Sequence, residues 1–252
     1  TVNDKNLGHL ARLKELREFN IETPTPEADI LAIQKILPAC PIAIKPSMEL
    51  VEAVASKPPV ERVLHFPAQK NLGRVLTREY TEKGGGAWKE FAAAQGDVKI
   101  PANTEVKLAV AADMSSDLTP LAKLEPNDIQ GLELVGDKVN DQSMASLRSL
   151  TGLRSLNVIH TKVTDDGVKH LENLVLLREI ELYDVGLTDT GFAIFDNFKH
   201  LEHLFVVNAR LTNNSVKRLR TMKSLKQLHL GNAGITSEGL VTLKYDLPDC
   251  EV

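Results

Sequence analysis

The chain has 252 residues, of which 42% are hydrophobic and 25% are charged, and its formal net charge is −4. This length allows one or two domains with a substantial buried core, and the composition is typical of globular proteins. The charges are mixed along the chain, which argues against a broad attraction to nucleic acid or to a membrane surface. No apolar run reaches the roughly 18 residues that a membrane-spanning helix needs.

Cysteine usage is low and fits neither a disulfide framework nor a zinc site. Cys40 and Cys250 are the two cysteines, and neither lies in a CxxC motif or beside a histidine cluster. No cofactor or metal is therefore expected. The cellular compartment stays undetermined, with a preference for the cytoplasm.

The first part of the chain is expected to precede the main folded unit. Residues 1–42 carry leucines at every third position and then Thr25-Pro26, a pair that suits the cap and first position of a helix. Two interpretations remain open for this segment, a degenerate repeat-like unit and a helical segment. The proline-rich residues 43–60 are expected to form a linker around a short helix over Ser47–Ala55.

Residues 61–112 are expected to form a small β-rich unit. The stretch "RVLHF" is typical of a strand, and "VKIPANTEVKLAV" predicts a hairpin. Gly84–Gly86 could suggest a phosphate-binding loop, but no Lys-Ser/Thr pair follows, and a mobile turn is the better interpretation. Trp88 and Phe91 come next and are expected to anchor a small core. In the hairpin, the facing positions would be Val98 and Ile100 on one strand and Val106, Leu108 and Val110 on the other.

Residues 113–128 connect this unit to the second half of the chain. Leu118, Leu121 and Leu124 recur at helical spacing. They predict a short apolar helix that caps the first repeat described below.

Residues 129–252 contain five successive copies of a 24-residue pattern, L-x-x-L-x-L. Its first position is occupied by Ile129, Leu153, Leu177, Leu201 and Leu225, and its second by Leu132, Leu156, Ile180, Leu204 and Leu228. Self-similarity at such a period indicates a solenoid built from stacked units. The last six residues, "LPDCEV", are expected to form a C-terminal cap with a truncated sixth strand.

Each copy predicts a strand, a turn and a helix. Apolar and polar residues alternate along the L-x-L stretch, as in a half-buried strand. A threonine then precedes apolar residues at helical spacing, at Thr164, Thr188, Thr212 and Thr236. Its hydroxyl suits a helix N-cap, and the carboxylates of Asp165 and Asp189 suit the positive end of the helix.

These units resemble leucine-rich repeats of the "ITDxGL" type, the cysteine-containing or ribonuclease-inhibitor-like class that is also found in bacterial, planctomycete-like proteins. The resemblance implies an α/β fold, a right-handed solenoid with parallel strands on its concave face and helices on its convex face. Curvature is also expected on physical grounds, because parallel strands lie about 4.8 Å apart whereas packed helices need about 8–10 Å.

The candidate binding site is the set of strand residues that point away from the core. Since leucines point inward, the residues between them face the concave side. One column contains Glu133, Asn157, Glu181, Phe205 and His229, and the next contains Val135, Ile159, Tyr183 and Val207. Such a cluster of apolar and aromatic residues with a polar rim is typical of a protein-binding site. The N-terminal half of the chain, or a second copy, is the alternative cover for it.

No catalytic set is predicted. His160, His203 and His229 lie in or just after strands, but they fall in different columns and do not form a ligand set. Asp165-Asp166 is explained by its place at a helix start. A metal-assisted hydrolase that uses the histidines is therefore the least favoured hypothesis.

We expect a non-enzymatic protein–protein interaction module whose concave face binds a protein ligand, with Tyr183 and Phe205 as anchors. The alternative is a regulatory or substrate-recruiting portion of a larger multidomain protein, such as a kinase or a ubiquitin-ligase-like assembly. Self-association through the concave face or a sheet edge is a further possibility. Nucleic acid and membrane-spanning partners are not expected.

Overall fold

The computed structural model describes residues 19–21, 42–44, 58–81, 85–114 and 117–252. The chain divides into two compact units, Thr1–Val54 and Ala55–Val252. In the first unit, β1 (Phe19–Ile21) pairs in parallel with β2 (Ile42–Ile44). The predicted Ser47–Ala55 helix and the Thr25-Pro26 helix start lie outside the described residues.

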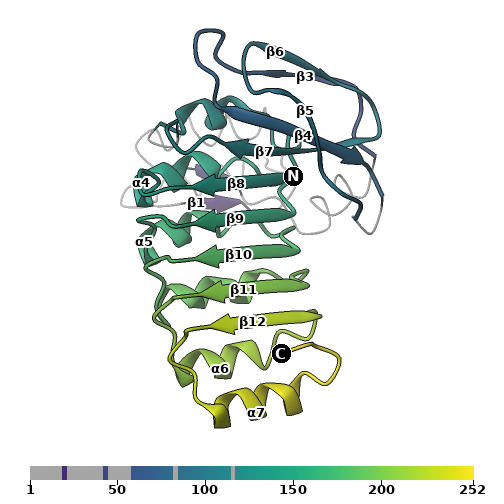
Figure 1. Cartoon of the computed structure of the whole chain (residues 1–252). Helices are drawn as coiled ribbons and strands as arrows, with labels where there is room; N and C mark the ends of the chain where they lie inside the picture. The colour runs from purple at the N-terminus through teal and green to yellow at the C-terminus, as the bar shows by residue number, and fades with distance from the viewer. Residues whose placement is uncertain (1–18, 22–41, 45–57, 82–84, 115–116) are drawn as a thin grey trace, which may run out of the picture. The chain divides into compact units, whose positions relative to one another are not determined.

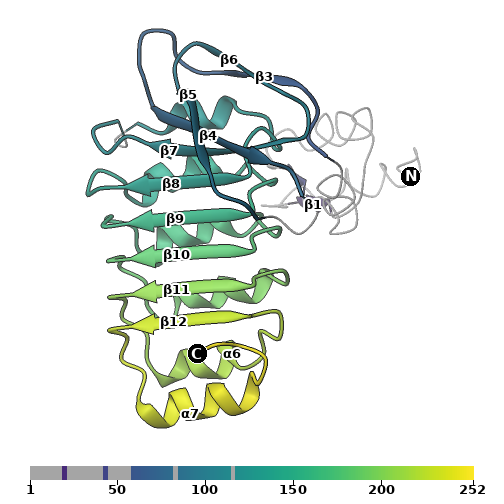
Figure 2. The ribbon, with the colours of Figure 1, turned by 45° about the vertical axis from the view of Figure 1, so that its right-hand side comes forward.

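The second unit is built on one eight-stranded sheet with the order β12-β11-β10-β9-β8-β7-β4-β5. These strands are β4 (Gly73–Glu79), β5 (Lys89–Ala93), β7 (Thr104–Val110), β8 (Gly131–Val135), β9 (Ser155–Ile159), β10 (Glu179–Tyr183), β11 (His203–Val207) and β12 (Gln227–Gly231). Strands β7 to β12 pair in parallel, whereas β4 pairs antiparallel with β7 and β5. Figures 1 and 2 show the parallel strands as one continuous stack.

Helical segments connect the strands and cover one face of the parallel stack, leaving the opposite face of the strands to the residues between the leucines (Figures 1 and 2). They are η1 (Thr119–Lys123), α4 (Asp141–Met144), η2 (Ala145–Leu147), α5 (Asp165–Val168), η3 (Lys169–Leu171), η4 (Gly191–Asn197), α6 (Asn213–Leu219) and α7 (Ser237–Asp246). The η segments are 3-10 helices, which are narrower than α-helices and are used in short pieces. None of the helices in the described part of the chain is long and apolar enough to cross a membrane.

The register of the parallel strands repeats the period of the sequence. Leu132 lies beside Leu156, which lies beside Ile180, and the same 24-residue step continues through Leu204 to Leu228. Equivalent residues of successive units are therefore stacked directly on one another. The predicted α/β leucine-rich repeat solenoid is confirmed.

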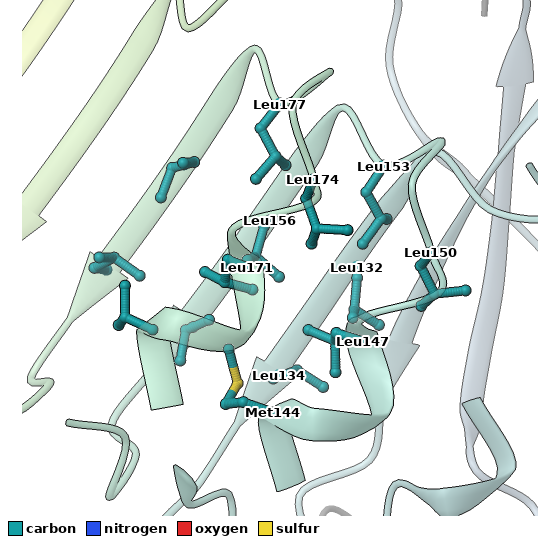
Figure 3. Packing of buried hydrophobic residues seen from close by; sticks show 14 of the residues in the cluster. Leu132, Leu134, Met144, Leu147, Leu150, Leu153, Leu156, Leu171, Leu174 and Leu177 are labelled. Atoms are coloured by element: carbon teal, nitrogen blue, oxygen red, sulfur yellow. The ribbon is translucent and has the colours of Figure 1, made fainter. Parts of the chain in front are cut away.

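The core lies between the strands and the helical segments and consists of the predicted inward residues. Leu132 and Leu134 on β8 and Leu156 on β9 are completely buried, as are Met144 and Leu147 from α4 and η2. Figure 3 shows these side chains meeting between the sheet and the helices. Complete burial of a leucine contributes about 1.5–3 kcal/mol to the free energy of unfolding. The stacked rows of buried leucines therefore supply most of the stability.

In the unit that contains η4, phenylalanines replace the smaller apolar residues of the other units. Phe192 and Phe195 stack with ring centroids 4.4 Å apart, and Phe198 meets Phe195 edge-on at 5.4 Å. These residues occupy the positions of Val168, Leu171 and Leu174 in the preceding unit. All three rings are buried, so this unit has a bulkier core than its neighbours.

Thr164, Thr212 and Thr236 cap their helices as predicted. The prediction was wrong for Thr188, because η4 begins later, after Thr190. The aspartates beside these threonines act between units. The Thr164 hydroxyl accepts a hydrogen bond from the Asp166 backbone N–H, at 3.4 Å. The Asp165 carboxylate instead accepts two hydrogen bonds from the next unit's Thr188, from its backbone N–H at 2.7 Å and its hydroxyl at 2.6 Å. Interpreting Asp165 only as a partner of its own helix's positive end was therefore incomplete.

The same contact recurs at each step of the array. Asp141 binds Thr164, Asp189 binds Thr212, and Asn213 binds Thr236. This contact between units also explains the glycine of the "TDxG" motif, which is Thr188 to Gly191 in the unit that contains η4. A Cβ atom on Gly191 would lie 2.3 Å from an Asp165 carboxylate oxygen, which is too close for any other residue without a local shift.

The predicted hairpin in the β-rich region does not form. Instead, β6 (Asp97–Ile100) pairs antiparallel with β3 (Arg62–His65), and β7 pairs with β4 and β8. Lys107 and Leu108 on β7 lie beside Gly131 and Leu132, the same 24-residue step that relates the repeats. Because β7 is apolar enough to be buried on both sides, it becomes the first strand of the parallel stack rather than one arm of a hairpin.

Two expected core anchors of this region are not buried. Phe91 is 46% exposed on β5. Trp88 is half-buried, and the Arg78 guanidinium lies over its ring at 4.1 Å from the centroid. The core of this region is made by smaller residues such as Leu64 and Val75, whereas β5 lies at the edge of the sheet and is largely exposed.

The two segments that flank the repeats pack against the outermost units. Leu118, Leu121 and Leu124 are buried, although the helix between them, η1, is a five-residue 3-10 helix rather than an α-helix. At the other end, Glu251 forms a parallel bridge with Gln227 of β12. This bridge occupies part of the edge that β12 would otherwise expose.

We expect Asp165→Ala to lower the free energy of unfolding by about 2 kcal/mol, because it leaves the Thr188 N–H and hydroxyl without their acceptor. Urea unfolding followed by circular dichroism measures the loss. Asp166→Ala is the matched control, since the exposed Asp166 carboxylate forms an ion pair with Lys169 of its own unit. Equal losses for the two variants would show that the contact between units does not stabilise the array.

Candidate protein-binding face

The strands place the predicted site residues in two columns on the concave face. The register aligns Glu133, Asn157, Glu181, Phe205 and His229 in one column and Val135, Ile159, Tyr183, Val207 and Gly231 in the other. Neighbouring members of a column lie on hydrogen-bonded strands, about 4.8 Å apart. A short and regular array of side chains is the result.

The apolar members of these columns form a ridge that is only half-covered. Val135, Ile159, Tyr183, Phe205 and Val207 are all half-buried. Each of these residues is thus partly covered and partly accessible to solvent. We call these five residues the apolar ridge.

The two expected anchors are diagonal neighbours rather than a stacked pair. Tyr183 lies beside Val207 in the register, while Phe205 lies beside Glu181. The Phe205 ring is tilted against the ring of His229, with centroids 6.1 Å apart. Tyr183 and Phe205 thus offer two separate aromatic contacts, one on each column.

Asn157 differs from the other predicted contact residues because it is buried. Its side chain is 8% exposed, and its amide donates a hydrogen bond of 2.6 Å to the Glu181 carboxylate. The side chain therefore orients Glu181 and offers little surface of its own.

Carboxylates dominate the charge of this face. Burial, and then the neighbouring Glu179, raise the pKa of Glu181 above its ordinary value, while Lys107 counteracts part of this shift. Burial also raises the pKa of the Tyr183 phenol. Lys107 forms an ion pair with Glu133, with the nitrogen and oxygen 3.3 Å apart, and so places a positive charge beside these carboxylates.

Sequence reasoning missed the residues that β7 contributes next to these columns. Glu105 is completely buried and accepts hydrogen bonds of 2.7 Å from Arg78 and from Arg154. A buried carboxylate needs such cationic partners. The available signal was that Leu108 and Val110 lie 24 residues before Leu132 and Leu134, the same period as in the repeats.

A second ladder follows the ends of the strands and contains one of the three predicted histidines. His160, Asp184, Asn208 and Asn232 share a positive φ of 53–56°. Their side chains bind one another in order: His160 contacts Asp184, Asn208 donates to Asp184, and Asn232 donates to Asn208 at 2.8 Å. His160 is thus separate from His203 and His229 on the strands. The described ranges contain no group of three His, Cys, Asp or Glu residues that could hold a metal ion.

No model of a protein family matches the sequence, and no curated protein matches it. Solved structures with partial similarity are leucine-rich repeat proteins of bacteria. An internalin C2 from Listeria monocytogenes is 23% identical with a TM-score of 0.45, over 53% of this chain and 54% of that one. The internalin inlF of the same species is 21% identical with a TM-score of 0.39, over 54% of this chain and 43% of that one.

A leucine-rich repeat protein of Leptospira interrogans is 18% identical with a TM-score of 0.36, over 57% of this chain and 34% of that one. The matched part thus spans about half the length of the first of these proteins and less of the other two. The repeat architecture of the present chain is established by the 24-residue register of its own strands.

The raised pKa of Glu181 predicts a pH dependence of stability. The folded state binds this proton more tightly than the unfolded state, so the contribution is present below the ordinary pKa of 4.5 and is lost as pH rises through the folded value. Glu181→Gln keeps an oxygen for Asn157 and removes the buried charge. We expect this variant to melt no lower than the wild type at neutral pH and to lose this part of the pH dependence.

Melting temperatures measured from acidic to neutral pH test this expectation. Glu172→Gln serves as the control, since it removes an exposed carboxylate from the segment that follows η3. If Glu181→Gln destabilised the protein at neutral pH while Glu172→Gln did not, the charge of Glu181 would be favourable and the expected sign would be wrong.

Proposed function

We propose that this protein is a protein–protein interaction module and that its concave face binds the partner. The observation that carries the proposal is the apolar ridge, in which five half-buried apolar side chains lie on four adjacent strands. Protein-binding sites typically combine aromatic anchors with a polar rim. Here Tyr183 and Phe205 supply the aromatic anchors, and Glu133, Glu181 and His229 supply the rim.

Rigidity of the platform supports this assignment. The ridge residues are held by strands whose neighbours on both sides are hydrogen-bonded, and the side chains beneath them are completely buried. Binding to such a surface requires little ordering of the backbone, which favours affinity. The partner would be a folded surface or a segment that places apolar side chains against the ridge. No catalytic role is part of the proposal.

We expect Tyr183→Ala combined with Phe205→Ala to weaken binding of the partner by at least about 2 kcal/mol, roughly thirtyfold in Kd, since aromatic anchors dominate such interfaces. The pair Phe91→Ala and Tyr245→Ala is the matched control. It also removes one phenylalanine and one tyrosine, from exposed positions on β5 and α7.

The measurement begins with capture of partners from a source lysate on wild-type protein and on both double variants, followed by titration of the captured partner. Photo-cross-linking adds a positional test, with p-benzoylphenylalanine replacing Phe205 in one sample and Phe91 in another. A partner that cross-links from position 205 and is lost with the ridge variant supports the concave face. Binding that survives the ridge variant and is lost with the control would place the interface elsewhere.

A further inference from the structure

A hollow on the opposite side of the array is distinct from the concave face. It has a volume of about 610 Å³ and lies between η4 and α6, extending along the segments that follow them. Its lining includes the buried residues Phe195, Phe198 and Met222 and the cations Lys199, Lys217 and Lys223. We call this hollow the basic groove.

Positive charge is concentrated around this groove. Lys199, Lys217, Arg218 and Lys223 line it, against one carboxylate, Asp196. The protein as a whole carries a net charge of −4, so the local excess of cations is opposite to the overall charge. An excess of this kind attracts a negatively charged ligand to this place on the surface.

Two of the cations are available for a ligand. Arg218 pairs with Asp196, and the Lys223 ammonium group donates a hydrogen bond of 2.6 Å to the Asp246 backbone carbonyl. The amino groups of Lys199 and Lys217 are exposed, and neither has an ion pair with any residue in the described ranges. They come from two neighbouring units, one after η4 and one within α6. A ligand that contacts both must therefore span the boundary between two repeats.

The floor of the groove identifies the chemical class of the ligand. Phe195 and Phe198 are 1% and 2% exposed, so their rings cannot stack on nucleic-acid bases. Met222 is 8% exposed, so the floor offers little apolar surface to a lipid chain. What remains are the free ammonium groups of Lys199 and Lys217 and the hydroxyls of Thr221 and Ser224, which suit carboxylates carried on an extended backbone.

We propose that the basic groove binds an acidic peptide segment of a partner protein, with Lys199 and Lys217 contacting its carboxylates. The groove and the concave face lie on opposite sides of the strands, so this interaction is independent of the function proposed above. Because charge supplies most of the attraction, binding is expected to weaken steeply as the salt concentration rises.

The test is titration of the 252-residue chain with a short fluorescein-labelled peptide of alternating glutamate and serine residues, measured by fluorescence anisotropy at low and high salt. The same peptide with glutamine in place of glutamate controls for charge. We expect Lys199→Glu combined with Lys217→Glu to weaken binding of the glutamate peptide roughly tenfold or more.

Lys99→Glu combined with Lys138→Glu is the matched protein control, since it makes the same change in net charge at exposed positions away from the groove. Melting temperatures confirm that each variant is folded. Preference for the glutamate peptide that is lost only in the Lys199/Lys217 variant supports the proposal. Equal binding of both peptides, or equal losses in both charge variants, overturns it.

Two further arms separate this proposal from its alternatives. The Tyr183/Phe205 double alanine variant should bind the glutamate peptide as the wild type does, and a loss there would assign the peptide to the concave face instead. An oligothymidylate that binds the Lys199/Lys217 site more tightly than the glutamate peptide would show that nucleic acid is the ligand and would overturn the peptide assignment.

Discussion

Parallel pairing in a 24-residue register is the constraint on which the rest of the second unit depends. Each residue of a repeat strand lies beside the residue 24 positions later, from Lys107 on β7 to Gly231 on β12. A slip of one residue would turn the buried leucines outward, because successive side chains of a strand point to opposite faces. The register therefore fixes at the same time which residues form the core and which residues a partner can reach.

Three side-chain ladders follow from this register and hold the units together at different places. Leucines stack in the core, aspartates and threonines bind one another where the helices begin, and a polar ladder from His160 to Asn232 follows the strand ends. Each ladder joins a unit only to its neighbours, as expected for a repeat protein. A substitution in one unit should thus act mainly on that unit and the two beside it.

The two faces of the array differ in chemistry because one consists of the outward residues of the strands and the other consists of the helical segments. On the concave face, strands lie close together, and small differences between units produce the apolar ridge and its carboxylate rim. On the other side, η4 and the residue after it carry the bulky core of Phe192, Phe195 and Phe198. The basic side chains of the groove come from α6 and from the segments that follow η4 and α6. A single chain can in this way offer an apolar and acidic surface to one ligand and a basic groove to another.

The sequence by itself determined the repeat array, the inward leucines, three of the four cap threonines and the outward columns, because these depend on a local period that is visible in the residues. It did not reveal that β7 begins the parallel stack, since the stretch "VKIPANTEVKLAV", which contains β7, has the pattern of a hairpin. Only the tertiary structure decided that Asp165 binds the next unit and that Asn157 is buried beside Glu181, and only it brought Lys199 and Lys217 to one groove. Those outcomes depend on which segments pack beside one another, and alternation within a single strand or helix carries no information about its neighbours.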